Sequence, residues 1–173
     1  MSLYKEYITE VPDFPIEGVS FKDISPLLAD EGVFKSAITD MGRLVKNPDY
    51  WIGVDARGFI FASALSMIYG GGVIMCRKKG KLPPPTVGYK YQTEYSEDEL
   101  EIKDLDNFYR DVGYPSAVVV DDVLATGGTL QAVNELCLEA DYDVTDNLVL
   151  MDLEYVPKVD NFDLEVKNLV RYE

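Results

Sequence analysis

The spacing of hydrophobic residues along the chain predicts strands and helices in alternation. Short apolar runs are typical of strands buried on both faces, and apolar residues at intervals of three and four are typical of amphipathic helices. The first pattern, with one alternating run near the end, predicts strands at 51–54, 73–76, 118–120, 147–151 and 164–171. The second pattern predicts helices at 2–11, 31–46, 58–68 and 128–140. This order favours an open α/β fold, with a mostly parallel twisted sheet flanked by helices in a single domain, 1–173.

Two segments interrupt the alternation. Residues 11–26 contain too many prolines and glycines for regular structure, yet they are rich in apolar side chains. We expect the N-terminal part, residues 1–26, to fold over the rest of the molecule as a hood. Alternating apolar and polar residues at 86–95 and 100–103 predict a two-stranded insertion, residues 84–106, which we call the lid.

The most informative stretch is 118–130, where a predicted strand leads through a loop of small residues into a predicted helix. Free N–H groups at a helix N-terminus favour an anion, and Gly127 and Gly128 let the backbone approach it closely. Asp121 and Asp122 precede the loop and would repel a bare phosphate, whereas carboxylates bind sugar hydroxyls and hydrated Mg²⁺. The stretch therefore predicts a ribose 5-phosphate site. It is not a P-loop, because no lysine follows the glycines; an ordinary strand–helix turn with solvated aspartates is the alternative.

Two other segments carry cations at places suited to anions. Arg57 lies between a predicted strand and a predicted helix, within Asp-Ala-Arg-Gly at 55–58. The run 77–81 holds four cations in five residues, in a chain with only 16 Lys and Arg against 31 Asp and Glu. A solvated loop is the simplest explanation of such a run, but against this acidic background the clustering indicates an anionic ligand.

The composition excludes several classes of function. A net charge of −15 argues against nucleic acid or an anionic membrane as partner, because both require a basic surface. The absence of histidine excludes His-based zinc sites and Ser-His or Cys-His catalysis. Cys76 and Cys137 lie in apolar segments and are expected to be buried, reduced thiols. No apolar run approaches the ~20 residues that span a bilayer, and no signal-peptide core is seen, so we expect a cytoplasmic protein.

The stretch 118–130 resembles the phosphoribosyl-pyrophosphate motif of type I phosphoribosyltransferases. Its Asp-Asp-x-Leu-Ala-Thr-Gly-Gly-Thr core resembles the version in the adenine phosphoribosyltransferase family. The resemblance implies the type I phosphoribosyltransferase fold, with Asp121 and Asp122 holding the ribose hydroxyls. It also implies that five residues hold the 5-phosphate: Ala125, Thr126, Gly127, Gly128 and Thr129.

Two further segments resemble the pyrophosphate side of the same family. Val-Asp-Ala-Arg-Gly-Phe-Ile-Phe, residues 54–61, is similar to the family's pyrophosphate loop and implies that Arg57 contacts pyrophosphate. Arg-Lys-Lys-Gly-Lys-Leu-Pro, residues 77–83, implies that Arg77 and Lys81 are cations on the pyrophosphate side.

The purine side is matched less completely. Phe21 matches a residue that contacts the base, and Val123 is assigned to the same side. Lys22 stands where the family usually carries arginine, which keeps the charge but loses the planar guanidinium. On the lid, Glu94 followed by Tyr95 matches a Glu-Tyr pair near the purine ring, and this glutamate would handle the purine proton. The implied catalytic residues are Glu94, Arg57 and Lys81.

The resemblance implies purine salvage: adenine and phosphoribosyl pyrophosphate give AMP and pyrophosphate. Mg²⁺ is the implied cofactor, bound through the substrate and through water to Asp121 and Asp122, and the implied assembly is a homodimer. Ala125 favours adenine, because oxopurine members usually carry aspartate there. Changes at Ser20 and Lys22 leave a hypoxanthine or guanine phosphoribosyltransferase open as an alternative. A non-catalytic purine or phosphoribosyl-pyrophosphate sensor is the second alternative, and it would bind without turnover.

Overall fold

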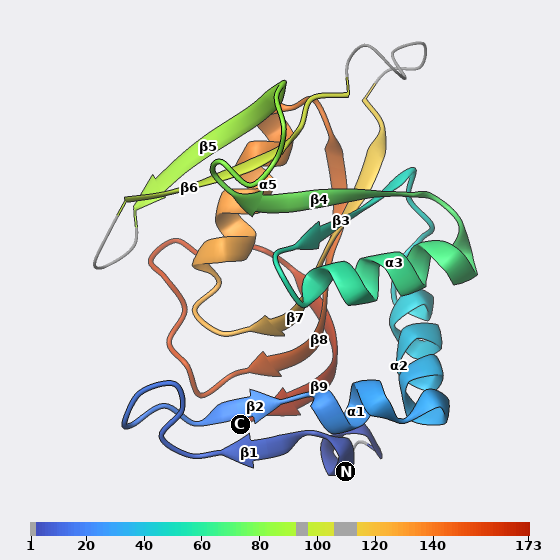
Figure 1. Cartoon of the computed structure of the whole chain (residues 1–173), viewed down its shortest axis with the longest axis vertical. Coiled ribbons are helices and arrows are strands. Elements are labelled where there is room, and N and C mark those ends of the chain that lie inside the picture. The colour runs from blue at the N-terminus through green and yellow to red at the C-terminus, as the bar shows by residue number, and fades with distance from the viewer. Residues whose placement is uncertain (1–2, 93–96, 106–113) are drawn as a thin grey trace.

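The computed structural model describes residues 3–92, 97–105 and 114–173, which form a seven-stranded sheet with helices on both faces (Figure 1). The strands lie in the order β5-β6-β4-β3-β7-β8-β9. They span Tyr50–Val54 (β3), Gly72–Lys78 (β4), Thr86–Gln92 (β5), Glu97–Lys103 (β6), Ser116–Leu124 (β7), Asp143–Leu153 (β8) and Val166–Tyr172 (β9). The neighbouring strands in the series β4-β3-β7-β8-β9 pair in parallel, and β6 pairs antiparallel with both β4 and β5. The predicted mostly parallel α/β sheet is confirmed.

The helices cover the sheet from both sides and bury its apolar strands (Figure 1). On one face lie α2 (Glu31–Arg43) and α3 (Gly58–Tyr69), and α5 (Gly128–Glu139) lies on the other. Because side chains alternate along a strand, β7 sends Val118 to the first core and Val119 to the second. The three predicted helices at 31–46, 58–68 and 128–140 are therefore confirmed, although the first ends at Arg43.

The N-terminal segment is more regular than its composition predicts. A 3₁₀ helix spans Leu3–Tyr7, and the short α1 spans Ser25–Ala29. Between them, β1 (Thr9–Val11) pairs antiparallel with β2 (Phe21–Asp23). The predicted helix at 2–11 is thus wrong beyond Tyr7, and the segment 11–26 is not without regular structure. The reason is tertiary: β-branched Thr9 and Val11 find a strand partner ten residues further along the chain.

The insertion 84–106 contains two antiparallel strands, as predicted, but they continue the main sheet rather than leaving it. Strand β6 pairs with the end of β4, with Glu101 opposite Arg77 and Leu100 opposite Lys78. The first two cations of the run 77–81 are therefore strand residues, not loop residues. Residues 93–96, which join the two lid strands, lie outside the described ranges.

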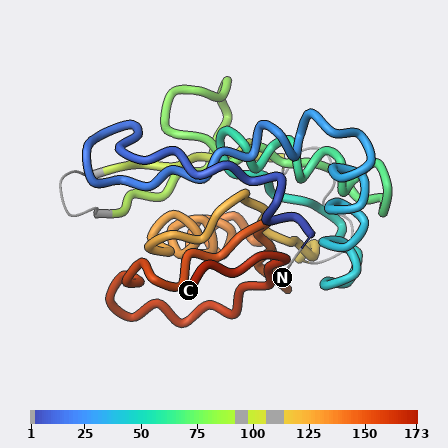
Figure 2. The backbone as a smooth tube through the Cα atoms, turned by 90° about the horizontal axis from the view of Figure 1, so that it is seen from below, coloured from blue at the N-terminus to red at the C-terminus, as the bar shows by residue number. Residues whose placement is uncertain are grey.

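Both ends of the described chain lie at one end of the molecule (Figures 1 and 2). The ammonium of Lys5, in the 3₁₀ helix, lies 4.8 Å from the centre of the Tyr172 ring at the end of β9. The N-terminal strands are thereby held against the edge of the sheet that β9 forms.

Cys76 and Cys137 are buried and unpaired, as predicted. Burial raises the pKa of both thiols, that of Cys137 to about 12. None of the helices within the described ranges is both long enough and apolar enough to cross a membrane.

Candidate active site

The loop between β7 and α5, residues 125–129, has the geometry that the predicted anion site requires. The buried strand ends at Leu124, and Gly127 takes a left-handed conformation (φ 85°) that lets α5 begin at Gly128. The side chains of Thr126 and Thr129 are exposed beside this helix N-terminus. Backbone N–H groups and hydroxyls therefore face solvent together, as phosphate binding requires.

Residues 158–162, which are distant in the sequence, pack against this loop and bind its backbone carbonyl groups. The Lys158 ammonium donates to the carbonyl oxygen of Ala125 at 2.8 Å, and the N–H of Val159 donates to that of Thr126 at 2.8 Å. The Phe162 ring packs so closely on Gly127 that an added Cβ would lie 2.4 Å from it. No local sequence pattern marks Lys158 or Phe162, because the loop residues that they contact lie more than thirty positions earlier in the chain.

Asp121 and Asp122 stand near the end of β7 as a pair of neighbouring carboxylates, of which Asp121 is half-buried and Asp122 is buried. Burial and the neighbouring Asp122 carboxylate raise the pKa of Asp121 well above its ordinary value. Burial also raises the pKa of Asp122, which is 3% exposed, and the Arg57 guanidinium opposes that rise. Within the described part of the chain, Asp122 Oδ2 has no hydrogen-bond partner, although Arg57 Nε lies 3.0 Å away. An additional donor or cation would therefore stabilise this pair.

Arg57 links the acidic pair to the N-terminal segment. It precedes α3, and its guanidinium lies 5.0 Å from the centre of the Phe21 ring on β2. The helix reaches this position because Gly58 has no Cβ, which would otherwise lie 2.5 Å from the carbonyl oxygen of Val120. Phe21, Arg57 and Asp122 thus form one row across three separate elements, with an aromatic ring at one end and a carboxylate at the other.

The basic run lies next to this row. Arg77 Nε pairs with Asp55 Oδ2 at 2.9 Å, and Arg77 Nη1 donates to the carbonyl oxygen of Lys81 at 3.4 Å. Lys78 and Lys79 pair with acidic residues of β6. Lys81 is exposed and makes no ion pair with any described residue. Arg57, Arg77 and Lys81 therefore surround one region at the C-terminal ends of β3 and β4, where open α/β sheets bind ligands.

Comparison with known proteins agrees with this arrangement. No family model matches the chain. Over 170 residues it is 42% identical to the adenine phosphoribosyltransferase of Mycoplasma mobile, covering 97% of this chain and 96% of that protein. The chain belongs to the adenine phosphoribosyltransferase family.

Solved structures of this family have the same fold. The adenine phosphoribosyltransferase of Thermoanaerobacter pseudethanolicus is 33% identical, with a TM-score of 0.86 over 98% of each chain. The enzyme from Saccharomyces cerevisiae, solved with an imino-altritol bisphosphate and adenine, is 29% identical, with a TM-score of 0.84 over 96% of each chain.

One residue that the family resemblance assigns to the purine side lies elsewhere in the structure. Neighbouring strand residues face opposite sides, so Phe21 turns to Arg57 while Lys22 turns away. The Lys22 ammonium lies 3.0 Å from Glu10 Oε2 and 4.6 Å from the centre of the Tyr172 ring. The structure therefore does not bring Lys22 into the group, and gives it a role in holding the N-terminal strands to β9.

The lid strand β5 contacts the loop 125–129 directly. Tyr91 on β5 shares a side-chain hydrogen bond with Thr129, and its pKa is raised, chiefly by burial. A cavity of about 260 Å³ lies beside this contact, lined in part by Tyr89 and Gly128. Glu94, the lid residue expected near the purine, lies outside the described residues. Val123 is half-buried against the core at the end of β7.

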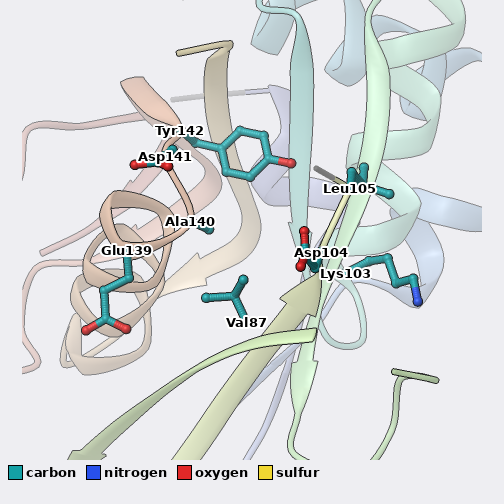
Figure 3. A pocket seen from close by; sticks show the side chains of 8 residues that line it. All are labelled: Val87, Lys103, Asp104, Leu105, Glu139, Ala140, Asp141 and Tyr142. Carbon is teal, nitrogen blue, oxygen red and sulfur yellow. The ribbon is translucent and has the colours of Figure 1, made fainter. Parts of the chain in front are cut away.

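A second cavity, of about 70 Å³, lies at the other end of α5 (Figure 3). It is lined by Val87 and Lys103 from the base of the lid and by Glu139 and Tyr142 from the end of the helix. This position is remote from the C-terminal ends of the parallel strands, so we do not assign it to the active site. Within residues 3–92, 97–105 and 114–173, no group of three or more His, Cys, Asp or Glu is placed to hold a metal ion.

Proposed function

We propose that this protein transfers the 5-phosphoribosyl group from phosphoribosyl pyrophosphate to adenine, giving AMP and pyrophosphate in purine salvage. The observation that carries the proposal is Arg57, which contacts both the carboxylate of Asp122 and the ring of Phe21. A substrate made of a base, a ribose and a pyrophosphate would meet all three kinds of group along this row. The Saccharomyces cerevisiae relative, solved with adenine, supports the same base.

The reaction replaces one bond at the anomeric carbon with another. A ring nitrogen of adenine forms the new bond to carbon 1 of the ribose while the bond to pyrophosphate oxygen breaks. Positive charge develops on the ribose and negative charge on the leaving group, as in glycoside chemistry. Arg57, Arg77 and Lys81 stabilise the departing charge, and the loop 125–129 fixes the 5-phosphate.

Three groups act on the base. Phe21 packs against the purine, Val123 borders it, and Glu94 accepts the proton that the attacking nitrogen must lose. Ala125 leaves room without adding a carboxylate, which favours adenine over an oxopurine. Lid closure excludes water, which would otherwise hydrolyse the donor.

Mg²⁺ fits the acidic pair as a substrate-borne ion rather than as a resident metal. Two neighbouring carboxylates with raised pKa values favour a cation nearby, but two ligands do not make a complete cage. Asp121 and Asp122 would hold the ion through water and through the ribose hydroxyls. When bound, Mg²⁺ neutralises part of the pyrophosphate charge.

A homodimer, the expected assembly, is supported by an exposed apolar surface on α3 and β4. Met67 is 86% exposed, and the surface comprises Ile60, Met67, Ile68, Val73 and Met75. Exposed apolar patches of this kind mark protein interfaces. A cytoplasmic location is supported by the two buried, unpaired cysteines.

The test is pyrophosphate release from phosphoribosyl pyrophosphate and Mg²⁺ with adenine, hypoxanthine, guanine or xanthine supplied separately. We expect release with adenine only. Release with an oxopurine instead would overturn the base assignment, including the weight placed on Ala125. Donor binding without turnover on any base would identify a sensor.

A further inference from the structure

Glu101 is a buried carboxylate to which the proposed reaction gives no role. It lies on β6, is 5% exposed and stands opposite Arg77 in the strand register. Arg77 pairs with Asp55 instead, and Glu101 makes no ion pair with any described cation. A buried charge without a partner is strongly unfavourable, so other groups must stabilise it.

Backbone N–H groups of the loop 80–82 provide this stabilisation. Glu101 Oε1 accepts from the N–H of Lys81 at 3.0 Å and from the N–H of Leu82 at 2.8 Å. Oε2 accepts from the hydroxyl of Thr86 at 3.4 Å. Burial raises the pKa of Glu101, but these bonds and one from the N–H of Gly80 outweigh it, so the net shift is downward. The carboxylate is therefore ionised and binds the loop backbone.

This loop carries Lys81, whose side chain makes no ion pair within the described ranges that would fix it. Its direction is set by the backbone, and the backbone is bonded to Glu101 on either side of the peptide that joins Lys81 to Leu82. The loop continues directly from Arg77 on β4, beside the region that Arg57 and Asp122 border.

We propose that Glu101 is a positioning residue: it holds the backbone of residues 80–82 so that Lys81 faces the leaving pyrophosphate. This inference rests on the proposed function only for the identity of the anion. The lid strand β6 thereby contributes to leaving-group binding through a residue that never touches the substrate.

Binding of Mg²⁺–pyrophosphate and of ribose 5-phosphate, each measured by calorimetry, tests the proposal without requiring turnover. In Glu101→Ala we expect pyrophosphate affinity to fall about tenfold, the effect of losing hydrogen bonds to a charged group, while ribose 5-phosphate affinity is unchanged. Glu101→Gln keeps one carbonyl oxygen for the two N–H groups, and its amide can donate to Thr86, so affinity should stay within about threefold of the parent. Glu99→Ala is the matched control, because Glu99 lies on the same strand and pairs with Lys79 on the surface.

A double-mutant cycle separates positioning from general destabilisation. In a Lys81→Met background, Glu101→Ala should have no further effect on pyrophosphate affinity, because the group it positions is gone. If the Ala variant does not fold, Glu101→Leu, which fills the buried volume, takes its place in the cycle. Unchanged pyrophosphate affinity, equal loss of both ligands, or full additivity with Lys81→Met would each overturn the proposal. Failure of the parent protein to release pyrophosphate would overturn the proposed function alone, since the binding results stand independently.

Discussion

The two proposed anion sites of this protein differ in the groups that would bind the ligand. The loop 125–129 offers backbone N–H groups and hydroxyls, and its nearby cation, Lys158, is occupied by three protein oxygens, including Asp152 Oδ1 at 3.0 Å. The proposed pyrophosphate side instead offers side-chain cations. Two of them are paired with carboxylates, Arg57 with Asp122 and Arg77 with Asp55, and among the described residues Lys81 is anchored through its backbone alone.

The difference matches what each site must do in the proposed reaction. The 5-phosphate remains on the product, so a rigid backbone site that never changes charge suits it. Pyrophosphate forms and leaves, and the charge it develops is stabilised by side-chain cations that already lie beside it. Disrupting one site should therefore leave the other largely intact.

The largest effect is expected for Arg57→Ala. It removes the cation that neutralises Asp122 and meets the leaving group, so turnover should fall by about 10²–10³-fold. Steady-state pyrophosphate release measures this loss. Arg43→Ala is the control, because Arg43 is an exposed arginine paired with Asp40 on α2. Near-normal turnover of Arg57→Ala would remove Arg57 from the mechanism.

Gly127→Ala should damage the phosphate loop through its backbone. The new Cβ would meet both an unfavourable φ of 85° and the Phe162 ring at 2.4 Å, which together destabilise the protein by about 1–3 kcal/mol. Melting temperature and the KM for phosphoribosyl pyrophosphate should both report it. At Gly128 an added Cβ would be 3.5 Å from Val159, an ordinary contact, so Gly128→Ala should melt like the parent. Equal destabilisation by the two variants would contradict the role assigned to Gly127.

Lys158→Met tests whether the loop must be held from behind. The substitution keeps most of the side-chain volume but leaves the carbonyl oxygens of Ala125 and Leu153 without their donor, at about 1–3 kcal/mol for the buried groups. We expect the KM for phosphoribosyl pyrophosphate to rise several-fold with little change for adenine. An equal rise for both substrates would show that Lys158 serves overall stability only.

The smallest effect expected is a pH-dependent gain in stability in Asp121→Asn. The pKa of Asp121 is raised in the folded protein, so its contribution to stability is present at acid pH and is lost as pH rises through that value. Asparagine does not titrate, so the variant should gain melting temperature over the parent as pH rises above about 4, by about 2–4 °C. Asp163→Asn, at an exposed position, is the control. A gain independent of pH would contradict the assigned cause.

Local sequence determined much of the fold, and long-range contacts determined the rest. The phosphate loop was predictable because an apolar run, two glycines and a helical stripe lie within thirteen residues. The strands at Thr9 and Phe21 were not, since each exists only through pairing with the other. The positions of Lys22 and Lys158 were equally hidden, because their partners, Tyr172 and Ala125, are distant in the chain. The sequence of the loops thus predicts the chemistry of the site, whereas it does not predict which distant residues hold those loops in place.

Four titrations test most directly whether the two anions are bound by separate sites of different construction. Ribose 5-phosphate and Mg²⁺–pyrophosphate would each be titrated into Lys81→Met and Gly127→Ala. We expect Lys81→Met to lose at least about tenfold in pyrophosphate affinity and to bind ribose 5-phosphate normally, and Gly127→Ala to show the reverse. Equal loss of both ligands in both variants would show that the two loops form a single site, and would contradict the claim.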